Sequence, residues 1–339
     1  MVKSTTTQET LVLAVDIGGT KIASAVITSG GKILHRIVEP TLQNGPSSGI
    51  QQIIQILETL IQSNSINRDQ LKGIGIGIPA VLENVTDFII WGPNLKDWKQ
   101  VDLRGSLESH FGIPVSVEYD GHTAVLGEWW MGAGCGYQSI VSVIIGTGVG
   151  GGMVLDGNLV RGINRLAGAV GWFIMDHPVQ CTQEKERSLG SWEARIAGPG
   201  IALRASRLLE TEKSAHSVLS ATGKDPTAED VFEAASQGDA LALRITAEEA
   251  ELLGMGLANI VSLVNPEIII LGGSVGSHAG FLLPQIKTIV DRYAQPISAQ
   301  SVKIVTSRLG TDAGLLGAAY GILLRFKRPE ILNSKGEND

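Results

Sequence analysis

The residues best suited to chemistry form a short run near the start of the chain, Asp16-Ile17-Gly18-Gly19-Thr20-Lys21. The run follows an apolar, branched stretch over residues 11–15, so it stands at the end of an expected strand. Two adjacent glycines allow a tight turn that presents backbone N–H groups to an anion, while Thr20 and Lys21 add a hydroxyl donor and a positive charge. Asp16 supplies a carboxylate that can hold Mg²⁺, directly or through water. The run predicts a phosphate-binding turn, although Gly-Gly alone would be typical of an ordinary hairpin.

A second glycine turn covers residues 146–152 and also stands between two expected strands, 139–145 and 153–155. Its glycines overlap a G-x-G-x-x-G pattern, but a dinucleotide-binding fingerprint would be followed by a helix, and here a strand follows. The chain contains no G-x-x-x-x-G-K-[ST] phosphate loop either. Strand, glycine turn, strand thus occurs once in each half, which indicates two related lobes. Two such turns facing each other across a cleft would hold a polyphosphate from both sides.

A third group, Glu118-Tyr119-Asp120-Gly121-His122, lies between an expected buried strand and an expected helix. A carboxylate at such a boundary can accept the proton of a hydroxyl, or orient that hydroxyl, during phosphoryl transfer. Asp120 could equally be only the N-cap of a helix that begins at Gly121. Gly272 and Gly273 follow another buried strand, where they would let an adenine ring lie against the backbone or would simply turn the chain.

The composition restricts the classes of protein that fit. A chain of 339 residues, with 43% hydrophobic and 18% charged residues and 42 glycines, is typical of a turn-rich α/β protein with two lobes. The net charge of -7 gives no basic surface for nucleic acid or for an anionic membrane. No apolar run approaches the roughly 20 residues that span a bilayer, and the polar N-terminus contains no signal core. The two cysteines, Cys135 and Cys181, have no disulfide or metal spacing, so we expect a cytoplasmic protein.

Periodicity supplies the elements that must position these groups. Glycine alternates with isoleucine over residues 73–79, which predicts a buried strand whose backbone comes close to another element. The other expected elements are three strands within 11–39, helices over 49–66, 102–111 and 123–132, a strand over 114–118, a mostly helical stretch over 191–263, strands over 267–271 and 302–306, and a helix over 314–326. We expect a small N-terminal lobe of residues 1–118, to which the helix at about 312–327 returns, and a large lobe of residues 119–311.

In this order the motifs resemble those of the ROK family, within the actin-like ATPase superfamily, over about residues 11–324. The resemblance rests on DIGGTK at Asp16, GIGIGIPA at Gly73, PNLKDW at Pro93, EYDGHTAVLGE at Glu118, IGTGVGGGMVLDG at Ile145, LAGAVG at Leu166, NPEIIILGG at Asn265 and DAGLLGAA at Asp312. It implies a two-lobed, actin-like (ribonuclease H-like) α/β fold with a cleft between the lobes. It also implies transfer of phosphate from ATP, with Mg²⁺, to a hydroxyl of a hexose, aminosugar or related polyol. The implied partners are the sugar, ATP and a second copy of the chain in a homodimer, without nucleic acid or membrane.

The resemblance also carries residue roles onto this sequence. Asp120 falls on the catalytic base. The nucleotide and Mg²⁺ set comprises Asp16, Gly18, Gly19, Thr20 and Lys21 at the first turn, Gly146, Thr147 and Gly148 at the second, and Gly272 and Gly273 on the adenosine side. The expected sugar-binding set is Gly77, Pro79, Asn94, Tyr119, Asp120, His122, Gly168, Trp172 and Glu193.

Several positions depart from the family pattern. Where the family reads L-A-G-E-x-G-H, this chain has Ala169 for the Glu and Trp172 for the His, and Tyr119 replaces an Asn that normally contacts the sugar. Losing a polar side chain that binds a sugar hydroxyl removes preference for that hydroxyl, at ~1–3 kcal/mol for each buried group left unpaired. An indole instead offers a flat apolar face for stacking. We therefore expect a substrate unlike plain glucose: another epimer, a deoxy or substituted sugar, or another polyol. The alternative is that Trp172 is only core packing.

The family's zinc motif, C-x-C-G-x-x-G-C, is also missing. The corresponding stretch, residues 181–187, has one cysteine, Cys181, with His177 nearby. These cannot supply the four ligands of a closed structural zinc site, so we expect no zinc.

Two other functions stay open. The altered sugar positions are compatible with a catalytically inactive sugar or nucleotide sensor, although Asp120 and both glycine turns are intact. A sugar-responsive transcriptional regulator is less favoured, because that branch of the family carries an N-terminal helix-turn-helix. Only about ten polar residues precede the first expected strand here, and the sequence shows no basic patch.

Overall fold

The structure is a computed structural model that describes residues 9–92, 95–175, 190–211, 217–222 and 224–327. The chain divides into two compact units. Unit 1 comprises Met1–Gly132, Arg161–Ala167 and Asp312–Asp339, and unit 2 comprises Ala133–Val160 and Gly168–Thr311. The first crossing between them follows Gly132, later than the boundary expected at residues 118 and 119, because the helix after Asp120 packs on the last helix of unit 1.

Unit 1 is built on a five-stranded sheet with the order β3-β2-β1-β4-β7. The first three strands are antiparallel neighbours, and β1, β4 and β7 run parallel. Its strands are β1 (Leu11–Ile17), β2 (Lys21–Thr28), β3 (Ile33–Pro40), β4 (Leu71–Ile78) and β7 (Val115–Tyr119), with a small second sheet of β5 (Val81–Leu82) and β6 (Ile89–Trp91). Its helices are α1 (Pro46–Ser63), α2 (Leu103–Phe111), α3 (Asp120–Met131) and α12 (Ala313–Lys327), with a 3-10 turn, η1 (Arg68–Gln70).

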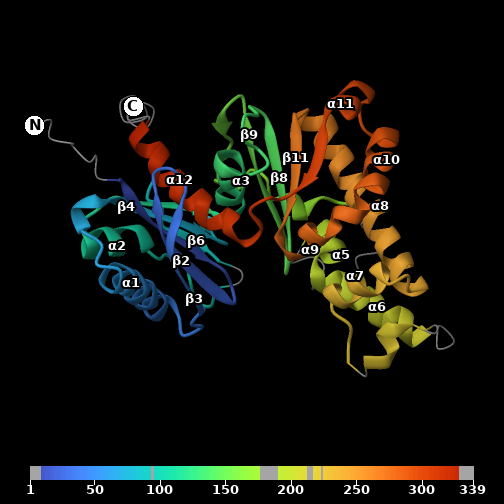
Figure 1. The fold of residues 1–339 in the computed structure, drawn as a ribbon, viewed down its shortest axis with the longest axis horizontal. Coiled ribbons are helices and arrows are strands. Elements are labelled where there is room, and N and C mark those ends of the chain that lie inside the picture. Colours follow the sequence, from blue (N-terminus) through green and yellow to red (C-terminus); the bar gives the residue numbers. More distant parts are fainter. Residues whose placement is uncertain (1–8, 93–94, 176–189, 212–216, 223, 328–339) are drawn as a thin grey trace, which may run out of the picture. The chain divides into compact units, whose positions relative to one another are not determined.

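The alternating glycines of β4 decide how helices cover this sheet. Ile74, Ile76 and Ile78 belong to the apolar core that they share with α1 and α2. The glycines point to the opposite face, where a Cβ on Gly75 would lie 1.9 Å from the carbonyl oxygen of Ala318 in α12. The expectation that this strand's backbone closely approaches another element is confirmed, and Figure 1 shows α12 on the side of the sheet away from α1.

Unit 2 repeats this plan with a second five-stranded sheet of order β10-β9-β8-β11-β12. Its strands are β8 (Ile140–Ile145), β9 (Val149–Leu155), β10 (Asn158–Leu159), β11 (Ile268–Gly272) and β12 (Lys303–Thr306). Again the first pairs are antiparallel, and β8, β11 and β12 are parallel. The two sheets therefore share order and strand sense, as the repeated strand–turn–strand pattern predicted.

Helices make up most of the rest of unit 2, as expected from residues 191–263. The longest, α8, is capped at its C-terminal end by Asn265, which adopts a left-handed conformation (φ 51°) before β11. The helices are α5 (Ser191–Ile196), α6 (Gly198–Thr211), α7 (Ala228–Ser236), α8 (Ala240–Val264), α9 (Gly273–His278), α10 (Leu283–Tyr293) and α11 (Pro296–Ser301). The 3-10 turns are η2 (Val170–Trp172), η4 (Val218–Thr222), η5 (Ala279–Leu282) and η6 (Gly310–Asp312), the last of which spans the return to unit 1. Within the described residues, no helix combines the length and apolar character needed to cross a membrane.

Candidate active site

The first glycine turn joins β1 to β2 in unit 1, and neighbouring side chains fix its peptide planes. Thr41 Oγ1 donates to the Gly18 carbonyl oxygen and Gln43 Nε2 to the Gly19 carbonyl oxygen, each at 2.7 Å. In a trans peptide the N–H points opposite to the C=O, so the N–H groups of Gly19 and Thr20 face away from Thr41 and Gln43. This orientation suits an anion-binding turn. Sequence reasoning missed these two supporting side chains, because nothing local marks them.

Two carboxylates of unit 1, Asp16 and Asp120, have raised pKa values. Asp16 is the penultimate residue of β1, and glycines on two neighbouring elements leave room for it. A Cβ would lie 3.3 Å from Asp16 Oδ1 at Gly77 and 2.5 Å from Oδ2 at Gly314. Burial raises the pKa of Asp16 to about 6, against the opposing charge of Lys21. Burial, and then repulsion from Asp16, likewise raise the pKa of Asp120 to about 6. Such acidities are typical of functional sites and lie close to those wanted for a general base.

Asp120 stands at the junction of β7 and α3. It is the first residue of the helix, whose N-cap is Tyr119, and its Oδ1 accepts a hydrogen bond from the Gly121 N–H at 2.8 Å. Thr123 Oγ1 donates to the Asp120 carbonyl oxygen at 2.9 Å. The carboxylate therefore bonds the adjacent peptide rather than the N–H groups two or three residues on that an N-cap side chain normally takes. This geometry does not support the reading of Asp120 as only a helix cap.

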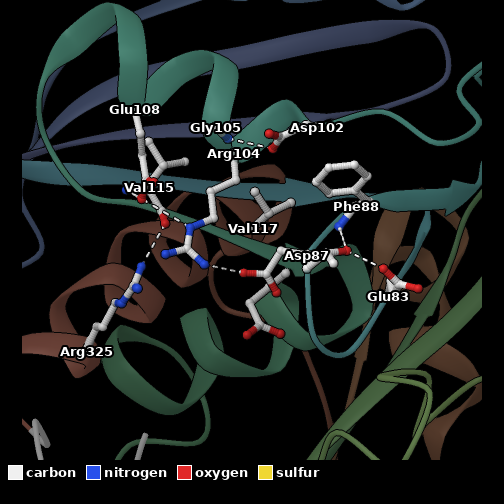
Figure 2. A network of polar contacts seen from close by, with 12 residues as sticks. Glu83, Asp87, Phe88, Asp102, Arg104, Gly105, Glu108, Val115, Val117 and Arg325 are labelled. Carbon is white, nitrogen blue, oxygen red and sulfur yellow. Dashed lines mark hydrogen bonds and ion pairs between the residues drawn. The ribbon is translucent and has the colours of Figure 1, made fainter. Parts of the chain in front are cut away.

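Side chains support β7, the edge strand that leads to Asp120. Glu108 Oε1 accepts from the Val115 N–H at 3.0 Å, and Arg325 Nη1 donates to the Val115 carbonyl oxygen at 2.9 Å. Figure 2 shows these contacts, with Arg104 bridging Glu108 and Asp87. Backbone groups on a free sheet edge need partners. Here the network satisfies both backbone groups of Val115 and so holds the start of β7.

Glu118, two residues before Asp120, is a buried carboxylate at the centre of a charge cluster. Arg161 and Arg165 place guanidinium nitrogens 2.7 and 3.2 Å from Glu118 Oε1. Although burial alone raises the pKa of Glu118, the His122 hydrogen bond and the two guanidinium groups outweigh it and hold the pKa at about 2. Arg165 also donates to the Val117 carbonyl oxygen at 2.7 Å, so the cluster clamps the end of β7. The sequence placed Glu118 in the motif but gave no sign of its arginine partners.

His122 is fully buried within this cluster. Its Nδ1 lies 3.3 Å from Glu118 Oε2, and its Nε2 lies 3.0 Å from the Ala167 carbonyl oxygen. The ring therefore holds the 161–167 segment against α3, and its effect on a bound sugar would pass through that segment. Tyr119 packs edge-to-face on the same ring at 5.3 Å. Tyr119 and His122, the two expected sugar-binding residues that flank Asp120 in the motif, therefore pack against each other. Asn94, also expected at the sugar, lies outside the described residues.

Unit 2 contributes the second glycine turn, between β8 and β9. The Gly146 N–H donates to the Gly148 carbonyl oxygen at 2.9 Å, which closes the turn, and Thr147 is exposed at its tip. Glu193 of α5 accepts from the Val149 N–H at 2.6 Å. The structure therefore brings Glu193, expected at the sugar, to the turn expected at the phosphates. Gly150 to Gly152 belong to β9 rather than to the turn, so the turn is shorter than the sequence suggested.

The other predicted residues of unit 2 lie around this turn. Gly273 (φ 81°) begins α9, and its missing Cβ would meet the Ile145 carbonyl oxygen at 2.3 Å, so the segment after β11 packs against the end of β8. Gly168 (φ 99°) is similarly close to β9, with the Gly151 carbonyl oxygen 2.5 Å from its Cβ position. Trp172 ends η2 with 53% of its surface exposed. That exposure argues against the alternative that Trp172 is core packing.

The remaining predicted positions belong to unit 1. Gly77 adjoins Asp16, as described above, and Pro79 directly follows β4. Lys21 is exposed at the start of β2. Cys181 and His177, on which the expectation of no zinc rests, lie outside the described residues. Within the part of the chain that the structure describes, no group of three or more His, Cys, Asp or Glu side chains is arranged to hold a metal ion.

Asp16 nevertheless fits the role of a magnesium ligand. Mg²⁺ is usually held by one or two carboxylates together with phosphate oxygens and waters, rather than by a cage of protein ligands. The glycines at positions 77 and 314 keep side chains away from the Asp16 carboxylate. A hard cation would also favour the ionised form that burial disfavours.

Comparison with known proteins agrees with this architecture. The ROK family model matches residues 12–323. A glucokinase of Halalkalibacterium halodurans is 34% identical over 316 residues, which cover 91% of this chain and 93% of the relative. The crystal structure of a ROK family glucokinase from Streptomyces griseus, in complex with glucose and AMPPNP, has a TM-score of 0.76 and 29% identity, covering 91% of this chain and 98% of that one. A putative xylose repressor of Caldicellulosiruptor is 26% identical over 92% of this chain and 78% of its own length.

The chain belongs to the ROK family. The expected fold class, the α/β fold of the actin-like sugar kinases of this family, is confirmed. Its similarity to these kinases makes the protein a carbohydrate kinase, as the motifs predicted.

Proposed function

We propose that the protein transfers the terminal phosphate of ATP to a hydroxyl of a small sugar, with Asp120 as the catalytic base. The observation that carries this proposal is the raised pKa of Asp120, about 6, at the end of a braced edge strand beside Asp16. A base with this acidity is mostly ionised at neutral pH, yet basic enough to accept a hydroxyl proton as that oxygen attacks phosphorus.

Each remaining group has a defined task in this proposal. The N–H groups of Gly19 and Thr20 bind phosphate oxygens, and Lys21 adds positive charge near them. Bound Mg²⁺ would supply charge that offsets the negative charge of the transferring phosphate. Asp16 would hold that ion. The Glu118 cluster contributes indirectly, because it fixes the main chain from which Asp120 projects.

For the substrate, we propose a sugar that differs from plain glucose where it faces Ala169 and Trp172. Ala169 supplies no side-chain hydrogen bond at a position where the family carries Glu, and the exposed indole of Trp172 offers a stacking face. A polar group that binds one hydroxyl discriminates strongly, and its loss relaxes that preference. Another epimer, a deoxy or substituted sugar, or a related polyol would fit these changes.

The test is ADP release with MgATP across hexoses, aminosugars, deoxysugars, pentoses and polyols, with Asp120→Asn as the inactive control. We expect turnover with one group of sugars, lost in the variant. If glucose gave by far the highest kcat/KM, the proposal of an altered substrate would be refuted, but the proposal of a sugar kinase would stand. Turnover that survives in Asp120→Asn would refute the role of Asp120.

A sugar- or nucleotide-responsive sensor without catalytic activity is the second candidate. The observation that favours it is the 26% identity to a putative xylose repressor. The same panel separates the two functions, because a sensor would bind nucleotide or sugar, measured by calorimetry, and release no ADP with any sugar.

A further inference from the structure

The short helix α5 and its flanks contact the second glycine turn at both ends of that turn. On one side, Glu193 Oε2 accepts from the Val149 N–H at 2.6 Å. On the other, the Gly198 N–H donates to the Gly146 carbonyl oxygen at 2.8 Å. Gly198 follows α5 after one residue, Ala197, whose N–H bonds the carbonyl oxygen of Glu193 at 3.0 Å. A six-residue helix thus braces a turn that lies 44 residues before it.

A brace works only if it is itself fixed, and Trp192 fixes α5. Its side chain has no exposed surface, and its Nε1 donates to the Leu252 carbonyl oxygen of α8 at 3.0 Å. Its ring stacks on Phe173 at 5.6 Å, and its own N–H bonds the Phe173 carbonyl oxygen at 3.0 Å. A Cβ on Gly256 would lie 2.2 Å from the indole, so α8 has a glycine where the ring presses on it. The backbone beside Glu193 therefore has little freedom.

Two glycines leave the space that the Glu193 side chain occupies. A Cβ on Gly148 would lie 2.9 Å from Glu193 Oε2, and one on Gly171 would lie 3.2 Å from the Cβ of Glu193. Partial burial raises the pKa of Glu193, while the Val149 N–H favours its ionised form and lowers that pKa. A hydrogen bond of 2.6 Å from N–H to a carboxylate is of the strong, charge-assisted kind.

We propose that Glu193 is a positioning residue for the second glycine turn, so that nucleotide binding depends on a residue otherwise expected to contact the sugar. The proposal rests on the function proposed above, in which this turn binds phosphate. A carboxylate has about four acceptor positions, so Glu193 can keep the Val149 N–H and still accept a sugar hydroxyl. Without the carboxylate, the turn keeps its internal Gly146–Gly148 bond and the Gly198 contact but loses the support at Val149. It then samples more conformations, which weakens phosphate binding.

The test compares Glu193→Ala, Glu193→Gln and the wild type without any sugar. The first readout is hydrogen exchange of the Val149 amide, and the second is the Kd for ADP measured by calorimetry. In Glu193→Ala the Val149 N–H loses its partner. We therefore expect its exchange rate to rise about tenfold or more over the wild type, and ADP binding to weaken about tenfold. Glu193→Gln keeps an amide oxygen that can accept from Val149, so it should stay within about threefold of the wild type in both readouts. Glu210→Ala, on the exposed face of α6, is the matched control.

Unchanged exchange at Val149 and unchanged ADP affinity in Glu193→Ala would overturn the proposal and leave Glu193 as a sugar contact only. If the wild type bound no ADP, the proposed kinase function would fail, while the Val149 exchange rate would still decide the positioning role. Should Glu193→Ala not fold, Glu193→Asp replaces it, because its shorter side chain keeps the charge but draws it back from Val149. Faster exchange at Val149 in Glu193→Asp is the expected result, and an unchanged rate would again overturn the proposal.

Discussion

Replacing Asp120 with Asn should stabilise the protein while it abolishes turnover. In the folded protein, burial and then repulsion from Asp16 raise the pKa of Asp120 from 3.8 to about 6. Each tenfold change in proton affinity is worth about 1.4 kcal/mol, so the ionised carboxylate costs at most about 3 kcal/mol of folding free energy. Asp120 keeps part of its surface exposed, so we expect a gain of about 1–3 kcal/mol. Asn retains an oxygen for the Gly121 N–H, so that bond is preserved.

The gain in folding stability of Asp120→Asn must depend on pH in a defined direction. A carboxyl whose pKa is raised by folding opposes folding increasingly as pH rises from its unfolded pKa to its folded pKa. The free energies of unfolding of wild type and Asp120→Asn should therefore agree near pH 4, diverge between about pH 4 and 6, and differ by a constant amount above about pH 7. The wild-type turnover rate should rise over the same range, because the base must be ionised.

The assay is denaturant unfolding at pH 4, 6 and 8 in the presence of EDTA, so that no cation screens the two carboxylates. Asp69→Asn, an exposed carboxylate of η1, is the control and should change stability by no more than about 0.5 kcal/mol. A variant that is less stable than the wild type at pH 8, or equally more stable at all three pH values, would refute the electrostatic account of Asp120.

Three further changes test other parts of the structure. Ala169→Glu with Trp172→His restores the family pattern and should raise kcat/KM for glucose at least about tenfold over other sugars; an unchanged ratio in ADP release would remove these positions from substrate selection. Gly75→Ala forces a Cβ to 1.9 Å from a carbonyl of α12 and should cost about 3 kcal/mol or prevent folding, whereas Gly280→Ala, with no atom nearer than 3.8 Å, should be nearly neutral in denaturant unfolding. Glu118→Gln removes the anion that the buried Arg165, which keeps Asp87, shares with the exposed Arg161, and the loss should cost about 3 kcal/mol at pH 7. Because the pKa of Glu118 is lowered to about 2, the wild type loses this advantage as pH falls from about 4.5 towards 2, and a loss independent of pH in thermal unfolding would contradict the ion-pair role.

The sequence predicted most of the elements because their signals are local. Asp102 caps α2, and Gly112 ends it in the left-handed conformation, as their residue types suggested. Boundaries moved by a few residues: α1 begins at Pro46 rather than at residue 49, because proline is well tolerated in the first turn of a helix. At the second glycine turn, the ladder with β8 starts at Val149, so flanking glycines belong to the strand.

The candidate site was predicted only where one residue's type and place in a motif define its role. Asp16 lies next to the end of β1, and Asp120 and the two glycine turns follow directly after strands, where the order of the chain places them. The same sequence could not tell which tryptophan is buried: Trp192 has no exposed surface, whereas Trp172 exposes 53%. Both lie in short helical segments, and the tertiary packing of Trp192 against α8 and Phe173 distinguishes them.

The sequence by itself determined the repeated strand–turn–strand plan, the glycine face of β4 and the place of Asp120 at a strand end, because these depend on neighbours within a few residues. Tertiary structure alone decided that α12 fills the glycine face, that Arg161 and Arg165 neutralise Glu118, and that Glu193 reaches back to Val149. Those pairs lie 43 or more residues apart in the chain, so no local pattern encodes them. Whether such distant groups come into contact depends on topology and close packing. Their contacts set the pKa values of the buried carboxylates and the rigidity of the strand and turn that carry the chemistry.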